Sequence, residues 1–167
     1  MASVTKLKPE EVRALEETLK SIVAAAVRAK GYADVIVRDI LPEDDLGLSG
    51  TDNAWKLTLS STGMNEGVIS KTLSDDTAIV FYGVRNLDNN DVTQVRFRLG
   101  EAKVKAVFQI EKALTEEDAT VYFEEPVIFK PNEVLNVDIE APTSGDKKLV
   151  LLGFVAEPKG KVMIGAE

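Results

Sequence analysis

The chain has 167 residues, a net charge of −8, and neither histidine nor cysteine. The missing side chains exclude disulfides, Ser-His-Asp and Cys-His catalysis, and zinc sites built on histidine or cysteine. The acidic balance argues against a nucleic-acid-binding surface, which requires a basic footprint.

The first expected element is an amphipathic helix over residues 9–30. Pro9 suits the first helical turn, and Gly31 suits the position after the last one. Apolar side chains recur between them at three-and-four spacing, which is typical of one apolar helix face. The interface candidates on this stripe are Val12, Leu15, Leu19, Ile22 and Ala26. The stripe packs either on the chain's own sheet or on a neighbouring subunit, and the sequence leaves both open.

After Gly31 the pattern changes to the short alternating segments that are typical of β-strands. The expected strands cover residues 35–40, 55–60, 77–84, 94–99, 103–110, 120–124, 127–129, 134–139 and 148–156. Residues 77–84 are apolar on both faces, which predicts a central strand. Gly100 and Glu101 lie between two alternating segments, which predicts a hairpin.

Breaks between the expected strands are marked by turn-forming residues. Residues 47–53, 61–67 and 86–91 are expected to be loops or turns, and residues 113–118 favour a short helical turn. Pro126 is expected to separate two strands, because proline cannot donate to a central ladder. Gly153, inside an apolar segment, predicts a bulge or a close backbone approach.

About eight or nine strands, without alternating βα units, predict a mostly β fold. We expect an antiparallel β-sandwich that is jelly-roll-like, with one N-terminal amphipathic α-helix. The expected organisation is a helical segment over residues 1–31 and a sandwich domain over residues 32–167. No apolar run approaches the roughly 20 residues of a membrane span, and no signal-peptide pattern opens the chain, so we expect no membrane partner.

Carboxylates are the only plentiful reactive groups, and their clusters fall at expected turns, where they favour turn formation. We therefore expect no catalytic residue, no cofactor and no enzyme activity; a hydrolase with two facing carboxylates is a weaker alternative. Asp88 and Asp91 are the metal candidates, because carboxylate oxygens suit calcium, although the spacing of an EF-hand loop is absent. A turn stabilised by an Asx hydrogen bond explains both residues equally well.

The main basic concentration on and beside the expected strands consists of Lys56, Arg85, Arg96, Arg98, Lys103 and Lys105. Arg96 and Arg98 share one face of their strand, and Lys103 and Lys105 share one face of the next. If the hairpin forms, these residues make a four-charge patch on a solvated sheet face. Such a patch either protects the sheet from edge pairing or docks an acidic partner surface.

Two late segments resemble the late strands of jelly-roll proteins associated with tailed-phage capsids. They are residues 125–137, EPVIFKPNEVLNV, and residues 149–160, LVLLGFVAEPKG. The likeness extends from residue 78 onward and is one of pattern, without a signature motif. It implies a capsid decoration or cement protein that binds the major capsid protein lattice, commonly as a homotrimer. Such a protein is made in the host cytoplasm and lies on the virion surface, and the family has no catalytic residues to carry over.

The residues also allow an alternative, a calcium- or carbohydrate-binding β-sandwich module of receptor-binding or adhesin type. A sugar-binding face needs an exposed aromatic platform. Aromatic residues make up only 6% of the chain, and most lie among apolar strand residues, where a core position is expected. The sequence keeps both functions open.

Overall fold

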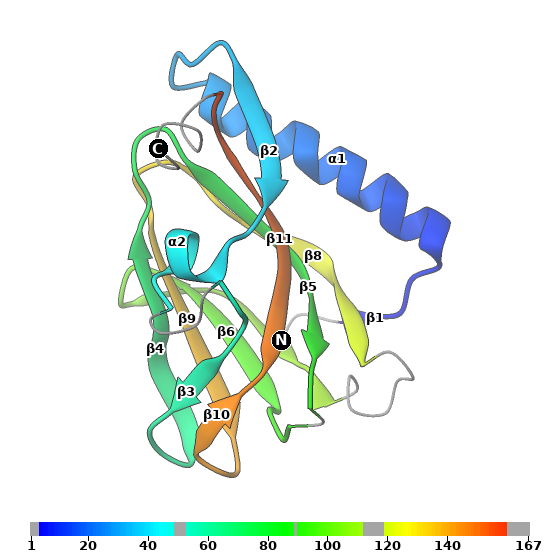
Figure 1. Ribbon diagram of the computed structural model, residues 1–167, viewed down its shortest axis with the longest axis vertical. Coiled ribbons are helices and arrows are strands. Elements are labelled where there is room, and N and C mark those ends of the chain that lie inside the picture. The colour runs from blue at the N-terminus through cyan, green and yellow to red at the C-terminus, as the bar shows by residue number, and fades with distance from the viewer. Residues whose placement is uncertain (1–3, 49–52, 89, 112–118, 160–167) are drawn as a thin grey trace.

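The computed structural model describes residues 4–48, 53–88, 90–111 and 119–159, and it shows an antiparallel β-sandwich with one long N-terminal helix (Figure 1). The helices are α1 Pro9–Arg28 and α2 Pro42–Leu46. The strands are β1 Val4–Thr5, β2 Val35–Asp39, β3 Leu57–Leu59, β4 Gly63–Thr72, β5 Ala78–Asn86, β6 Gln94–Leu99, β7 Lys103–Gln109, β8 Thr120–Phe129, β9 Val134–Ala141, β10 Gly145–Lys147 and β11 Leu149–Pro158. The helical turn expected at residues 113–118 lies outside the described residues.

The strands form two main sheets. The first has the order β1-β8-β5-β11-β2, the second has the order β4-β9-β6-β7, and β10 pairs separately with β3. Apart from the β6–β7 hairpin, successive long strands change from one sheet to the other, with β11 between β2 and β5 and with β9 between β4 and β6, as in a jelly roll. The expected jelly-roll-like sandwich is confirmed, as are the central position of β5 and the β6–β7 hairpin.

Aromatic side chains fill the space between the two sheets. Phe108 and Phe123 stack with ring centroids 3.7 Å apart, although they come from opposite sheets. Phe97 contacts both rings edge-on. These inward positions alternate with polar ones along their strands, which is how one sequence pattern produces one buried face.

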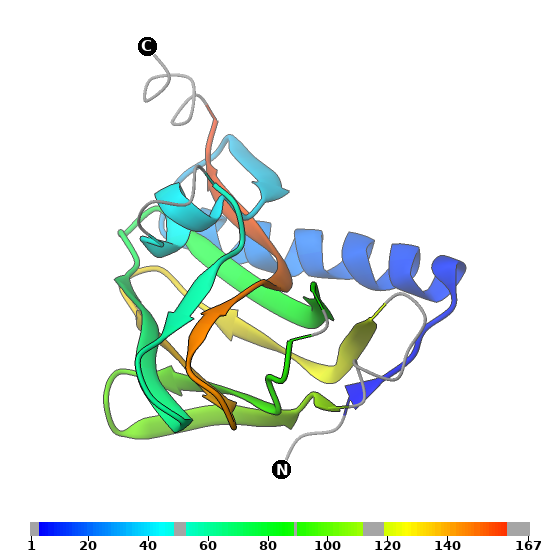
Figure 2. The ribbon, with the colours of Figure 1, turned by 60° about the horizontal axis from the view of Figure 1, so that its bottom comes forward.

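Helix α1 lies against the outer face of the first sheet (Figure 2). Its buried residues Leu19, Val23 and Val27 join an apolar cluster with side chains of β5 and β11. The Tyr82 hydroxyl of β5 donates a hydrogen bond to Glu16 of the helix at 3.3 Å. The molecule is therefore three layers deep where the helix lies and two layers deep elsewhere.

Gly153 confirms the close backbone approach expected from the sequence. The register between β11 and β5 shifts between Leu152 and Gly153. A Cβ atom at Gly153 would lie 2.1 Å from the Val80 carbonyl oxygen, a distance no side chain tolerates. Glycine is required here because the neighbouring strand occupies the space of a side chain.

Two expectations about strands are wrong. Residues 61–67 are not a loop, because β4 begins at Gly63. Only Asn65 and Ile69 of this strand are buried, and its register against β9 shifts between them, so it shows no regular alternation. Beyond the nine expected segments, β1, β4 and β10 are additional strands.

Pro126 does not end a strand either, because β8 continues through it. The Ile128 carbonyl points away from β5 and accepts a hydrogen bond from Lys105. Residues two apart in a strand direct their backbone groups to the same edge. The backbone nitrogen of Pro126, two residues before Ile128, therefore also faces away from β5. The missing N–H of proline therefore removes no hydrogen bond from the β5–β8 ladder.

Candidate functional site

The arginines of the expected basic patch belong to a buried ion cluster. Asp138 of β9 is fully buried and accepts hydrogen bonds from Arg98 Nε at 2.6 Å and from Arg96 Nε at 2.6 Å. Its second oxygen accepts from Arg98 Nη2 and from the Gly67 backbone amide, both at 2.8 Å. Burial raises the pKa of Asp138, but the hydrogen bonds from Arg98, Gly67 and Arg96 outweigh it and hold the pKa below its ordinary value.

The expectation of four solvated cations on one face is therefore wrong. Arg98 is buried, and Arg96 also reaches Glu66 at 3.2 Å, so both guanidinium groups are used within the chain. Lys103 and Lys105 are exposed on β7. The structure separates the four residues into an internal cluster and two surface cations.

A second, partly buried ion group joins β2, α2 and β11. Arg38 donates to Asp45 at 2.7 and 2.8 Å and to Glu157 at 2.7 Å. Asp45 also accepts from the Leu41 backbone amide at 2.6 Å, which fixes the start of α2. The hydrogen bond with Asp45 raises the pKa of Arg38, burial opposes this, and the bond with Glu157 adds to it. These carboxylates hold the fold together and do not face an open site.

The metal candidates Asp88 and Asp91 are each paired with a different lysine. Asp91 accepts hydrogen bonds at 2.5 Å from both Lys147 and Thr143, and the bond from Lys147 leads in lowering the pKa of Asp91. Asp88 is exposed, with Lys148 Nζ at 3.4 Å. Within the described part of the chain, no cluster of three or more carboxylates has the arrangement of a metal site.

The apolar stripe of α1 is used mainly within the chain. Leu19 is buried against the first sheet, and Leu15 and Ala26 pack on the same cluster. Val12 is half-buried, whereas Ile22 keeps 43% of its surface exposed. The contacts therefore favour the alternative in which the helix covers its own sheet.

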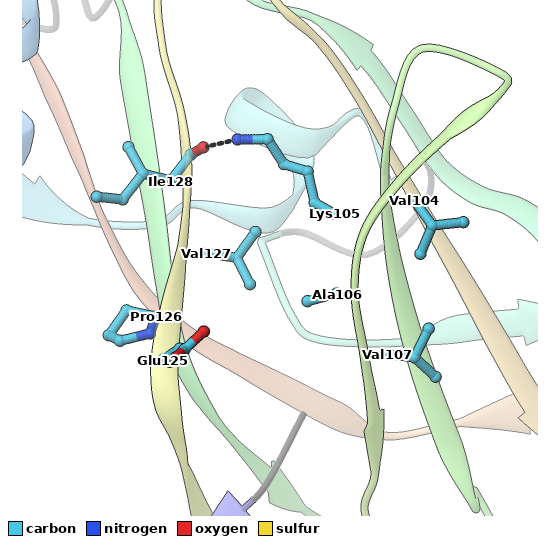
Figure 3. Close-up of a pocket in the computed structure, with 8 residues that line it drawn as sticks. All are labelled: Val104, Lys105, Ala106, Val107, Glu125, Pro126, Val127 and Ile128. Atoms are coloured by element: carbon cyan, nitrogen blue, oxygen red, sulfur yellow. Dashed lines mark hydrogen bonds between the residues drawn. The ribbon is translucent and has the colours of Figure 1, made fainter. Parts of the chain in front are cut away.

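An open groove lies between β7 and β8, where the two sheets meet without pairing. It has a volume of about 520 Å³ and is lined by residues 104–107 of β7 and residues 125–128 of β8. Among the described strands, β7 is the edge of the second sheet, and β8 is followed on its outer side only by the two-residue strand β1, which pairs with Tyr122 and Phe123. Figure 3 shows the two strand segments facing each other across the groove.

Apolar residues alternate with two charged ones, Lys105 and Glu125, along the groove, and the Lys105 side chain crosses it. Val104 is 49% exposed at its rim. Lys105 donates a hydrogen bond from Nζ to the Ile128 carbonyl at 2.5 Å (Figure 3). Its ammonium also lies 5.0 Å from the centroid of the Phe129 ring. Burial lowers the pKa of Lys105, an effect reinforced by the charges of Lys130 and Lys103 and opposed by Glu133.

Sequence patterns did not reveal this groove. Its walls are ordinary alternating strands, and only the sheet order shows that both have a free edge. The one available signal was Pro126, since proline inside a strand favours an edge position.

A second depression is formed mainly by polar groups of β3 and β4. It has a volume of about 350 Å³ and is lined by Thr58, Ser60, Ser61 and residues 64–68. No aromatic side chain lines it, and none of the aromatic residues in the described ranges falls in the exposed class. The stacked rings of Tyr82, Tyr122 and Phe154 lie beneath α1.

Comparisons with known proteins identify no family. No family model matches the chain, and no curated protein matches it. Among the helices of the described residues, none has the length and apolar content to cross a membrane.

Solved structures with similar shapes come from several classes of protein. A pilus protein of Bacillus endospore appendages has a TM-score of 0.38 at 7% identity, covering 75% of this chain and 88% of its own. A chain of rhinovirus-B5 has a TM-score of 0.38 at 8% identity, covering 92% and 77%. The C-terminal CBM6 of LamC from Zobellia galactanivorans has a TM-score of 0.33 at 11% identity, covering 73% and 99%. Values this low support no choice among these classes.

Proposed function

We propose that this chain is a non-enzymatic structural protein of a virus or phage particle, and that it binds a partner protein through the groove between β7 and β8. The observation that carries protein binding is the pair of unpaired strand edges facing each other across the groove. A free edge offers backbone donors and acceptors to an extended segment of another protein.

The dimensions of a sandwich suit such a segment. Neighbouring strands lie about 4.8 Å apart, and packed sheets lie about 10 Å apart. One added strand between the edges of two sheets therefore reaches both of them. The side chains of residues 104–107 and 125–128 supply the surrounding walls.

The chain itself provides a precedent on the same edge. β1 pairs with β8 at Val4–Phe123 and Thr5–Tyr122, on the side of β8 opposite β5. The groove continues along this strand from residue 125. The outer edge of β8 thus already accepts one short extended segment.

Separate observations support the proposal that the chain belongs to a virus or phage particle. Jelly rolls occur in viral capsid proteins, although they also occur in lectins, so the fold leaves several functions open. The resemblance of residues 125–137 and 149–160 to capsid-associated jelly rolls favours decoration of a capsid lattice by a homotrimer. The buried carboxylates Asp138 and Glu157 and the partly buried Asp45 are engaged by arginines, which suits a structural role. No observation specifically favours the carbohydrate-binding alternative.

The groove offers a matched pair of test variants. Val104 and Ile22 are the exposed large hydrophobic residues of the described chain, at 49% and 43%, one at the groove and one on α1. We expect Val104→Arg to weaken co-sedimentation with capsids assembled without this chain on the order of tenfold, and Ile22→Arg to leave it unchanged. Equal binding by both variants would contradict the groove, and absence of wild-type binding would contradict the capsid partner.

The oligomeric state tests the trimer independently. Light scattering at micromolar concentration is expected to give the mass of a trimer, with and without EDTA. A monomer would count against the decoration function. A mass or melting temperature that falls with EDTA would instead support the calcium-binding alternative, since a ligand that binds the folded state stabilises it.

A further inference from the structure

Lys105 occupies a β-bulge that turns it toward the groove. On β6 and β7, Phe97 pairs with Ala106 and Arg98 pairs with Val104, which leaves Lys105 as the extra residue. A bulge redirects a side chain from the regular alternation of its strand. The Lys105 ammonium consequently crosses the groove and bonds to the Ile128 carbonyl (Figure 3).

The two ends of the groove differ in charge. Lys103 and Lys130 lie close enough to Lys105 to act on its charge, and Glu133 is the one carboxylate that opposes them there. Glu133 also accepts a hydrogen bond from the Lys130 backbone amide at 2.6 Å. Glu125 lines the far end (Figure 3). The end near Ile128 therefore has an excess of positive charge.

An inserted strand would disturb one existing hydrogen bond. A segment that pairs with the outer edge of β8 donates its own backbone N–H to the Ile128 carbonyl, and the Lys105 ammonium then loses its acceptor. An ammonium enclosed between two strands and a peptide is costly unless a new acceptor replaces the lost one. A carboxylate on the incoming segment is the acceptor that also balances the charge.

We propose that the groove selects an extended partner segment that carries an Asp or Glu side chain opposite Lys105. This inference rests on the docking function proposed above and specifies the chemistry of the partner. The acidic side chain occupies the Ile128 end, and apolar side chains of the segment meet Val104 and Val127.

The test uses a displayed random-peptide library, selected on the wild-type chain after depletion on Val104→Arg. We expect the enriched peptides to share an acidic position. For synthetic versions, fluorescence anisotropy should show about tenfold weaker binding when that acid becomes its amide. Lys105→Met should cause a similar loss with the acidic peptide and little further loss with the amide peptide, because each change removes the same contact.

Controls separate charge recognition from folding. Lys71→Met, an exposed lysine on β4, should bind like the wild type, and Lys105→Arg should retain most of the affinity. Urea denaturation should show that Lys105→Met remains folded at the assay temperature.

The other outcomes overturn the proposal in distinguishable ways. Groove-dependent peptides that are neutral or basic would refute the acidic preference while supporting docking. The absence of any groove-dependent peptide would refute both. A dimer of this chain that Val104→Arg dissolves would show that a second copy is the occupant.

Discussion

The outer faces of the two sheets are completed by different means. The first sheet is covered by α1, and the contact is apolar, with Val23 and Val27 fully buried. The second sheet carries polar side chains outward, and its centre is closed by Asp138 between Arg96 and Arg98. The helix excludes water from the outer face of the first sheet. The ion cluster of Asp138 with Arg96 and Arg98 does so at the centre of the second.

This difference predicts which of the two faces tolerates single substitutions better. Apolar contacts are numerous and non-directional, so the loss of one leaves the others in place. The centre of the ion cluster depends on one carboxylate, and removing it leaves Arg98 without a carboxylate partner and Arg96 with only the exposed Glu66. We therefore expect the second face to be the more fragile under single substitutions.

The largest effect is expected for Asp138→Asn. Breaking a buried ion pair by removing one partner typically costs about 3–5 kcal/mol. We expect the free energy of unfolding, measured with urea, to fall by about 3 kcal/mol or more. Glu140→Gln, two residues along the same strand face, should change it by less than about 0.5 kcal/mol. If Asp138→Asn lowered the free energy of unfolding no more than Glu140→Gln does, the second face would not be the more fragile one.

Leu19→Ala tests the helix-covered face. Truncating a buried leucine costs about 2–5 kcal/mol, and we expect the lower end because α1 can shift toward the sheet. The exposed Ile22 provides the control, and Ile22→Ala should cost less than about 1 kcal/mol. Chemical denaturation of the two variants would contradict the packing described here if their losses were equal.

Acid should weaken the ion-cluster face selectively. The pKa of Asp138 is lowered in the folded state, so its stabilising contribution is present above the unfolded pKa of about 3.9 and is lost as pH falls through the folded value. We expect the free energy of unfolding to decline below about pH 4, and Asp138→Asn to decline less steeply there. Parallel curves for the two proteins would show that other carboxylates control acid unfolding.

The smallest effect is expected for Lys20→Met. The Lys20 ammonium lies 5.1 Å from the centroid of the Phe154 ring, at the margin of the helix-covered face. Such a contact is worth about 0.5–1 kcal/mol when partly exposed, and methionine keeps the apolar stem in place. A thermal shift of only a degree or two is therefore expected, and a large loss would mean that the helix margin carries more of the stability than its apolar centre.

Local patterns predicted much of the fold. The continuous apolar run of β5, the alternation of β6 and β7, and Gly153 each carry their physical cause in adjacent residues. β4 was missed because only Asn65 and Ile69 face the interior. The pairing of Arg98 with Asp138 joins residues 40 positions apart, so alternation alone predicted two solvated arginines. The groove depends on sheet order, which no single strand encodes.

The position of α1 also orders the steps of folding. The helix comes early in the chain, yet it packs on β11, which contains Gly153 and Phe154 near the other end. During synthesis its apolar face meets β2 and β5 first, and it is fully covered only when β11 has emerged and paired with β5. Contacts this distant in sequence slow folding and prolong exposure to aggregation. The outer side of the helix carries exposed charges such as Arg13 and Glu17, which favour solubility while the apolar face is incompletely covered.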